Sequence, residues 1–247
     1  MLHVEHLKKT YGTVEAIHDV SFDVRAGEFV CVVGPSGCGK TTLLKCVSGL
    51  LEPTAGDVHA DGTLALVFQE YSRSLFPWMT VRQNVAFPLR RKGVDKREAR
   101  AIVEQTLASV GLEHTLDRYP WQLSGGMQQR VAIARALAFK PQILLMDEPF
   151  ASVDAQTRAD LEDLVLEVRR QYEVTIVFVT HDIDESVYLS DRIVVLTPSP
   201  TTVQEVVDVP LGQPRDQVQT KERPEFAQLR AHVWRSIKRR ESTPVGV

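Results

Sequence analysis

Short apolar runs alternate with helical patterns along most of the chain. Glu28–Val33, Ile143–Met146 and Val174–Val179 are short and nearly continuous apolar runs, which are typical of strands buried on both faces of a sheet. From Lys96 to Val110, apolar residues recur at three- and four-residue intervals and form the stripe of an amphipathic helix. This alternation predicts an α/β fold with a mixed, largely parallel sheet covered by helices on both faces.

The remaining elements follow from the same patterns and from helix-stopping residues. Further helices are predicted over Thr41–Ser48, Gly125–Phe139, Gln156–Tyr172 and Pro224–Arg240. Strands are predicted over Leu2–Leu7 and Val14–Val24, which make the beginning β-rich, and over Val203–Val209 as an edge strand. The helix from Lys96 stands between strand-rich parts and is interpreted as part of a helical insertion. No internal repeat divides the sequence, so one compact domain is expected.

Length and composition place the chain among globular proteins. It has 247 residues, of which 43% are hydrophobic and 25% charged, enough to bury one or two cores. Its longest apolar runs are far shorter than the roughly 18 residues that a membrane helix needs. Met1–His6 has neither the basic lead nor the apolar core of a secretory signal. We therefore expect a cytoplasmic protein whose contact with a membrane would depend on a partner.

Charge and cysteine spacing argue against a nucleic-acid-binding protein, a zinc site and a thiol redox motif. The net charge of −3 and the pI of about 6.2 leave no excess of positive charge, which argues against nucleic acid as the main ligand. Cys31, Cys38 and Cys46 lack the paired spacing of a zinc site or redox motif, so reduced structural thiols are expected. The basic residues of the tail are interpreted as a solvated helix end; they are Arg235, Lys238, Arg239 and Arg240.

A glycine-rich loop joins the apolar run 28–33 to the helix predicted from Thr41. It reads Gly34-Pro35-Ser36-Gly37-Cys38-Gly39-Lys40-Thr41, followed by Thr42. Two glycines five positions apart, followed by Lys and Thr, form the phosphate-binding pattern of P-loop proteins. Backbone N–H groups of such a loop and the start of the following helix face the phosphates, while Lys40 contributes charge and Thr41 a hydroxyl for Mg²⁺. The alternative, an accidental glycine-rich turn, is disfavoured because a strand precedes the loop and a helix follows it.

Two consecutive carboxylates end the apolar run 143–146. Neighbouring side chains at the end of a strand point in different directions, so Asp147 is expected to face Mg²⁺ while Glu148 faces the attacking water. A solvated strand end is the alternative, and the glycine loop upstream makes a nucleotide site the preferred interpretation. These two motifs predict a nucleoside triphosphatase or a kinase without deciding between them.

A third motif distinguishes between these two classes of nucleotide-binding protein. Leu123-Ser124-Gly125-Gly126-Met127 lies between the other two and directly precedes the predicted helix. Ser124 is also an ordinary helix cap, but Gln122–Arg130 resembles the signature of ATP-binding cassette proteins, in which Met127 stands where Gln is usual. The resemblance implies that Ser124 and the two glycine backbones face a nucleotide phosphate held by a second subunit. A small-molecule kinase does not explain this motif.

Further residues match that family in order along nearly the whole chain. The resemblance implies that Tyr11 stacks on adenine and that Gln69 senses Mg²⁺ and the attacking water. It also implies that Ser152 and Asp154 belong to a loop at the dimer interface and that His181 contacts the terminal phosphate. Taken alone, Tyr11 would be an ordinary strand aromatic and His181 a structural polar residue.

One segment indicates the branch of the family. Tyr71–Val81, with Asn84-Val85 after it, resembles the segment that meets the membrane subunit in importers of nitrate, sulfonates, taurine and related solutes. The alternative is that Phe76 and Trp78 pack under the helical insertion. No heptad stretch separates Lys40 from Ser124, which excludes the coiled-coil arms of chromosome-maintenance relatives, and a single cassette disfavours the tandem translation factors.

The resemblance therefore implies an importer ATPase that uses ATP and Mg²⁺. Its partners would be a second copy in a head-to-tail dimer, transmembrane permease subunits and, indirectly, a solute-binding protein, with the chain peripheral on the inner face of the cell membrane. The expected organisation is a nucleotide-binding core over 1–75 and 140–210 with an antiparallel β subdomain, a helical subdomain over 76–139, and a tail over 211–247. A soluble cassette ATPase that acts as an assembly or regulatory factor is the alternative.

Overall fold

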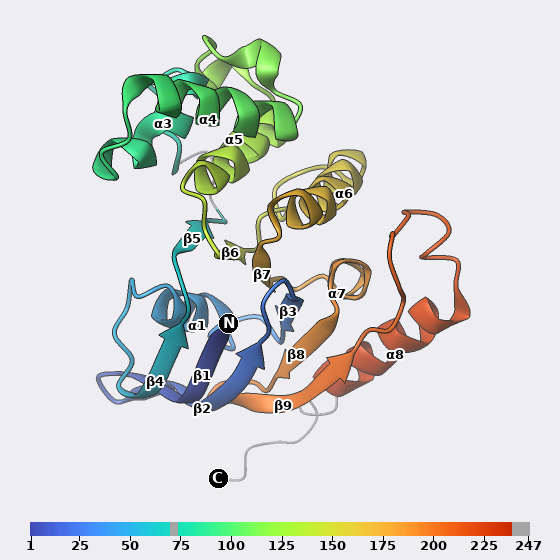
Figure 1. Cartoon of the computed structure of the whole chain (residues 1–247). Helices are drawn as coiled ribbons and strands as arrows, with labels where there is room; N and C mark the ends of the chain where they lie inside the picture. The colour runs from blue at the N-terminus through green and yellow to red at the C-terminus, as the bar shows by residue number, and fades with distance from the viewer. Residues whose placement is uncertain (70–73, 239–247) are drawn as a thin grey trace. The chain divides into compact units, whose positions relative to one another are not determined.

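The computed structural model describes residues 1–69 and 74–238. The chain forms two compact units, Met1–Gly62 with Thr175–Val247, and Thr63–Val174 (Figure 1). The predicted division into core, helical subdomain and tail stays a prediction. In the described parts of the chain, no helix combines the length and the apolar character needed to cross a bilayer.

The first unit is built on a mixed sheet with the strand order β4-β1-β2-β9-β8-β3-β7 (Figure 1). Its strands are β1 (Leu2–Tyr11), β2 (Val14–Val24), β3 (Phe29–Val33), β4 (Ala55–Ala60), β7 (Thr175–Val179), β8 (Arg192–Leu196) and β9 (Thr201–Asp208). Its helices are α1 (Lys40–Val47), α7 (Ile183–Leu189) and α8 (Pro224–Lys238). β3 pairs in parallel with β7 and β8, while β1 pairs antiparallel with β2 and β4. Every residue of β3 and β7 is buried, as their continuous apolar runs predict.

The position of β9 corrects one prediction from the sequence. The segment was expected at an edge, but β9 pairs antiparallel with β8 and, over a short stretch, in parallel with β2. It therefore joins the antiparallel strands of the beginning to the parallel strands of the core. The prediction was wrong because β9 is only partly buried along most of its length, and a half-exposed pattern does not distinguish an edge strand from a strand that joins two parts of a sheet.

The second unit combines two parallel strands with a group of helices. Its elements are β5 (Leu64–Val67), β6 (Ile143–Asp147), α3 (Val81–Arg91), α4 (Lys96–Ser109), α5 (Gly125–Ala138), α6 (Ala155–Tyr172) and the short 3-10 helices η1 (Glu113–Thr115) and η2 (Pro120–Gln122). β5 pairs with β6, and α5 packs against α3, α4 and α6. Thr80, Asp95, Ser124 and Asp154 cap the four α-helices by accepting hydrogen bonds from their first turns.

The predicted fold class is confirmed, since parallel strands with helices dominate the interior and antiparallel strands begin the chain. Among the described residues, two α-helices and the two 3-10 helices were not predicted. α3 contains Pro88 in its interior, which is ordinarily a helix-breaking signal, and α7 has only seven residues, too few to show a periodic pattern. Parts of two predicted segments, residues 70–73 and 239–240, lie outside the described residues.

Candidate functional site

The glycine-rich loop curls around the ammonium group of Lys40. Lys40 Nζ donates hydrogen bonds to the carbonyl oxygens of Gly34 (2.8 Å) and Pro35 (3.0 Å), and the residue is only 6% exposed. Gly37 and Gly39 have φ values of 75° and 100°, a left-handed conformation that favours glycine. The loop therefore holds a positive charge at its centre, the arrangement that a phosphate group requires.

The start of α1 is suited to an anion. The helix begins directly at Lys40, has no side-chain cap at Gly39 and carries no acidic residue in its first turn. The partial positive charge of a helix start is therefore not offset by a local carboxylate. Thr41, the residue expected to bind Mg²⁺, is exposed at this end of the helix. Loop and helix start together form a site for a phosphate chain.

Residues of β2 and β9 lie against the loop. Thr201 Oγ1, at the first position of β9, donates a hydrogen bond to the carbonyl oxygen of Cys38. A Cβ atom placed on Gly39 would lie 3.5 Å from Ala16 O and 3.6 Å from Thr201 Oγ1. Cys38 itself is buried, so it shapes the loop from inside. No sequence signal pointed to Thr201 as a support of the loop.

Tyr11 lies beside the first turn of α1, and its stacking on adenine stays a prediction. The residue is 47% exposed, and its hydroxyl lies 3.5 Å from Thr42 Oγ1 on α1. Lys9 Nζ lies 5.4 Å from the ring centroid, within reach of a cation–π contact. An exposed aromatic ring next to the phosphate loop is in a position to stack on a base.

His181 follows the strand that pairs with the one leading into the loop. β3 and β7 run in parallel, with Val32 opposite Val179, and the N–H of Thr180 donates to Val32 O (3.2 Å). The carboxyl ends of these strands therefore lie together, where ligands of α/β sheets bind. His181 is exposed there, at the same carboxyl end of the parallel strands as the beginning of the loop.

The residues on either side of His181 are fixed by side-chain hydrogen bonds. Thr180 Oγ1 donates to Glu185 Oε2 (2.6 Å) and accepts from the N–H of Asp182 (2.9 Å). Asp182 Oδ1 accepts from the N–H groups of Asp184 and Glu185 in the first turn of α7. Sequence reasoning missed Glu185, although Asp182 and Glu185 have the spacing of a helix cap and the third helical residue.

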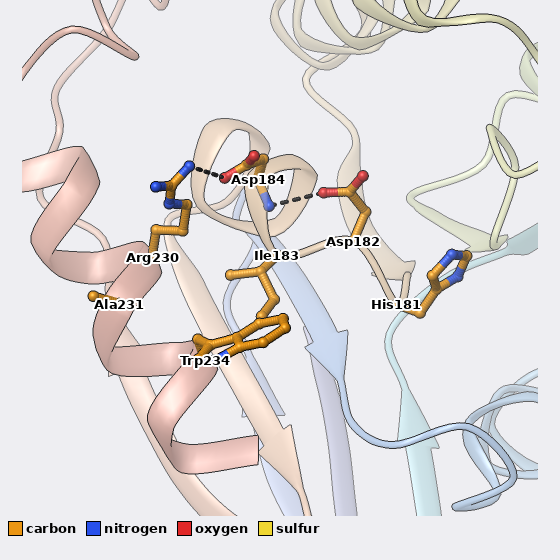
Figure 2. A pocket seen from close by; sticks show the side chains of 7 residues that line it. All are labelled: His181, Asp182, Ile183, Asp184, Arg230, Ala231 and Trp234. Atoms are coloured by element: carbon orange, nitrogen blue, oxygen red, sulfur yellow. Dashed lines mark hydrogen bonds and ion pairs between the residues drawn. The ribbon is translucent and has the colours of Figure 1, made fainter. Parts of the chain in front are cut away.

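A pocket of about 590 Å³ opens beside His181. It is lined by residues of the His181 loop, α7 and α8, namely His181, Asp182, Ile183, Asp184, Arg230, Ala231 and Trp234 (Figure 2). The volume is within the range of small-molecule sites, but charges of both signs line it. The pocket therefore indicates no single class of ligand.

In the second unit, Asp147 and Glu148 differ in backbone conformation. Asp147 is the last residue of β6 and is buried, whereas Glu148 follows the strand with a φ of 41°. Strand alternation therefore does not separate the two carboxylates, because Glu148 has left the strand in a left-handed turn. Such backbone strain in a non-glycine residue is often found at functional sites. Gln69 Nε2 lies 3.4 Å from Glu148 Oε2, so the structure brings these two candidates together.

The signature segment and the interface loop are neighbours. Ser124 is exposed and caps α5 by accepting a hydrogen bond from the N–H of Met127 (3.3 Å). Asp154 caps α6 in the same way, and hydrogen bonds from the N–H and hydroxyl of Thr157 lower the pKa of its carboxyl group. A Cβ atom on Gly126 would lie 2.4 Å from Thr157 Cγ2. Glycine at this position therefore also permits α5 and α6 to approach, a role not expected from the sequence.

This contact leads to a stability prediction. Gly126→Ala should lower the free energy of unfolding by about 1–3 kcal/mol, the usual cost of overpacking. Adding Thr157→Ser to this variant should restore the free energy of unfolding. The nearest remaining carbon of residue 157 would lie 3.8 Å from the new Cβ atom, and the hydroxyl bond to Asp154 is kept. Denaturant unfolding of both single variants and the double variant measures the effect. Equal stability of Gly126→Ala and the unaltered chain would contradict the predicted clash.

The predicted site residues thus fall into two groups. Gly34–Thr42, Tyr11 and His181 lie in the first unit, and Gln69, Asp147, Glu148, the signature 123–127 and the interface loop with Ser152 and Asp154 lie in the second. Ser152 is exposed in the turn that precedes α6. The individual roles of these residues stay predictions.

Comparison with known proteins identifies the family. The model of the family described as ABC transporter matches residues 17–151. A nitrate import ATP-binding protein of Synechococcus elongatus is 42% identical, over 97% of this chain and 92% of that protein. A bicarbonate transport ATP-binding protein of Synechocystis sp. is 41% identical, over 94% of this chain and 87% of that protein. A solved dimeric ATP-binding cassette, in a post-hydrolysis state with ADP and phosphate, has a TM-score of 0.75 at 32% identity and covers 85% of this chain and 99% of its own. With the loop, the carboxylate pair and the signature in place, these matches show that the chain belongs to the ABC transporter family, as one of its ATP-binding cassette ATPases.

Proposed function

We propose that this ATPase energises the uptake of a small solute, of the nitrate, sulfonate or taurine kind, through a separate permease. The observation that carries the ATPase part is the phosphate loop, where the buried ammonium of Lys40 and the uncapped start of α1 lie together. The relatives that are named for nitrate import and bicarbonate transport support the importer part. The chain would act on the cytoplasmic side, attached to the permease.

The residues present fit Mg²⁺ bound together with ATP. In the described residues, no group of three or more His, Cys, Asp or Glu side chains is arranged to hold a metal ion by itself. Mg²⁺ typically binds one or two protein oxygen ligands together with substrate phosphates and water. The exposed hydroxyl of Thr41, the carboxylate of Asp147 and the amide of Gln69 would provide such oxygens. When bound, Mg²⁺ neutralises charge on the phosphates.

Three side chains would have separate roles in ATP hydrolysis. Lys40 stabilises the negative charge that develops on the transferred phosphoryl group. Glu148 orients and polarises the attacking water, and its contact with Gln69 supports this role by limiting where the carboxylate points. His181 donates a hydrogen bond to the terminal phosphate, and the fixed backbone on both sides of it supports that role.

The proposed catalytic unit is a head-to-tail dimer. Ser124 and the start of α5 would face the nucleotide that is held by the loop of the partner, so each site uses residues of both copies. The dimeric state of the solved relative supports this arrangement. Hydrolysis then removes the triphosphate that bridges the two copies, and the release of the interface is transmitted to the permease.

An exposed aromatic cluster is the proposed contact with the permease. Phe76, Trp78 and Phe87 form it, and the ring centroids of Trp78 and Phe87 lie 5.6 and 4.6 Å from that of Phe76. Trp78 is 70% exposed. The buried side chain of Asn84 accepts from the N–H of Phe76 and donates to three carbonyl oxygens of the same loop. Trp78 is thus exposed on a loop that Asn84 holds by hydrogen bonds, instead of packing under the helices, and exposed tryptophans of this kind often anchor interfaces.

Co-purification with the permease tests the proposed function. The chain is expressed with a candidate permease, extracted in detergent, and captured through a tag on the permease. Trp78→Ala should reduce capture at least about tenfold, as for a buried tryptophan anchor, whereas Trp121→Ala, an equally exposed tryptophan of the same unit (69%), should not. ATP hydrolysis without capture of the unaltered chain would instead favour the soluble assembly or regulatory ATPase.

A further inference from the structure

The chain beyond β9 lies against α7, the helix that follows His181. This C-terminal segment, residues 209–238, is outside the part matched by the family model. It contacts α7 near both ends of the helix. Any part that the segment plays in ATP hydrolysis rests on the proposed function of His181.

Arg215 binds the carboxyl end of α7. Its Nη1 donates to Val187 O (3.0 Å) and Tyr188 O (2.9 Å), and its Nη2 donates to Ser190 O (2.9 Å). Its Nε donates to Gly212 O (2.8 Å), which orients the guanidinium. The last carbonyl groups of a helix have no partner within the helix and carry partial negative charge. A guanidinium with several fixed donors satisfies them in a way that a single ammonium does not.

Helix α8 contacts the beginning of α7. Arg230 Nη1 lies 3.6 Å from Asp184 Oδ1, and Trp234 lies beside Ile183 in the pocket wall (Figure 2). Both charged side chains are about half exposed, so this ion pair contributes little. α8 is itself attached to β9, since His232 Nε2 lies 3.0 Å from Glu205 Oε2 and Gln204 Nε2 donates to Ser236 O (2.9 Å). The stronger restraint on α7 is therefore Arg215.

A displacement of α7 would reach His181 through two short connections. Glu185 of α7 holds the hydroxyl of Thr180, the residue before His181, and α7 begins directly after Asp182. With only seven residues in the helix, its two ends move together. A shift of about 1 Å in a catalytic group is enough to cost on the order of 100-fold in rate.

We propose that Arg215 is a positioning residue for His181, acting through the carboxyl end of α7. The C-terminal segment then contributes to ATP hydrolysis without touching the nucleotide. Removal of the guanidinium releases α7 and lets the backbone around His181 move, while the phosphate loop and its affinity for ATP are unchanged.

Hydrogen exchange and kinetics on the full chain test this proposal. Arg215→Ala should speed amide exchange in a peptide covering 180–190 by at least about tenfold and lower kcat about tenfold, with KM for ATP within about twofold. Arg215→Lys, which keeps the charge with fewer fixed donors, should fall between. The matched control is Arg223→Ala, because Arg223 donates to Leu211 O within the same segment and not to α7; it should leave exchange at 180–190 unchanged.

A double-mutant comparison separates positioning from general destabilisation. In a His181→Ala background, Arg215→Ala should lower kcat by less than about twofold further, because the group it positions is gone. If Arg215→Ala does not fold, the Arg215→Lys variant carries the same comparison. Unchanged exchange at 180–190, an equal effect of Arg223→Ala, or a full further loss of kcat in the His181→Ala background would each overturn the proposal. If Arg215→Ala speeds exchange at 180–190 but His181→Ala is fully active, the restraint of α7 by Arg215 is supported. The proposed role of His181 in hydrolysis is then refuted instead.

Discussion

Glu148→Gln should retain ATP binding and lose hydrolysis. The exchange keeps the size and shape of the side chain but removes the carboxylate that is proposed to accept a proton from water, and general bases typically contribute about 10²- to 10⁴-fold to rate. Because the bridging triphosphate then persists, the ATP-bound dimer should accumulate. Phosphate release measures the first effect, and light scattering during gel filtration with ATP measures the second.

Glu173→Gln is the matched control for this variant. Glu173 is an exposed acid of the same unit that also has a positive φ, 49° against 41° at Glu148, and it lies at the end of α6. It should hydrolyse ATP at the unaltered rate, and the ATP-bound dimer should not accumulate under turnover. Normal hydrolysis by Glu148→Gln would refute the assigned base, and a strictly monomeric protein at saturating ATP, with hydrolysis disabled and the permease supplied, would refute the composite dimer site.

Lys40→Ala should weaken ATP binding itself. The ammonium is buried in the loop on two carbonyl oxygens, and loss of a buried charged partner usually costs about 2–5 kcal/mol, so the Kd for ATP should rise about 30-fold or more. Equilibrium binding of a fluorescent ATP analogue measures it. Lys45→Ala, further along α1 and exposed, should bind as the unaltered chain does. An unchanged Kd for Lys40→Ala would contradict the assignment of the loop.

The sequence was most informative where a motif and its secondary-structure context agree. The loop 34–41 was predicted between a strand and a helix because the apolar run before it and the stop at Gly49 are local signals, and α1 begins one residue before the predicted start. Asp147 at the end of β6 follows from the same logic. Both positions depend on residues that are close in the sequence.

Long-range contacts account for the features that were not predicted. Thr201 supports the phosphate loop from a strand 163 positions later in the chain, and Arg215 reaches α7 from a loop with no regular structure of its own. The positive φ of Glu148 has no marker either, since glutamate rarely adopts that conformation. Such features arise from tertiary packing, which short-range patterns do not record.

The double attachment of β9 constrains how the chain can be shortened. Its first residue supports the nucleotide loop and its middle holds α8, so one strand serves both the phosphate site and the last helix of the chain. A truncation placed after Asp208 would keep the support of the phosphate loop by β9 but remove the C-terminal segment that contacts α7. A truncation placed before Thr201 would remove both the support of the loop and the contacts with α7. Engineers who want a minimal cassette should therefore cut downstream of β9, and should anticipate a nucleotide-binding protein that turns over poorly.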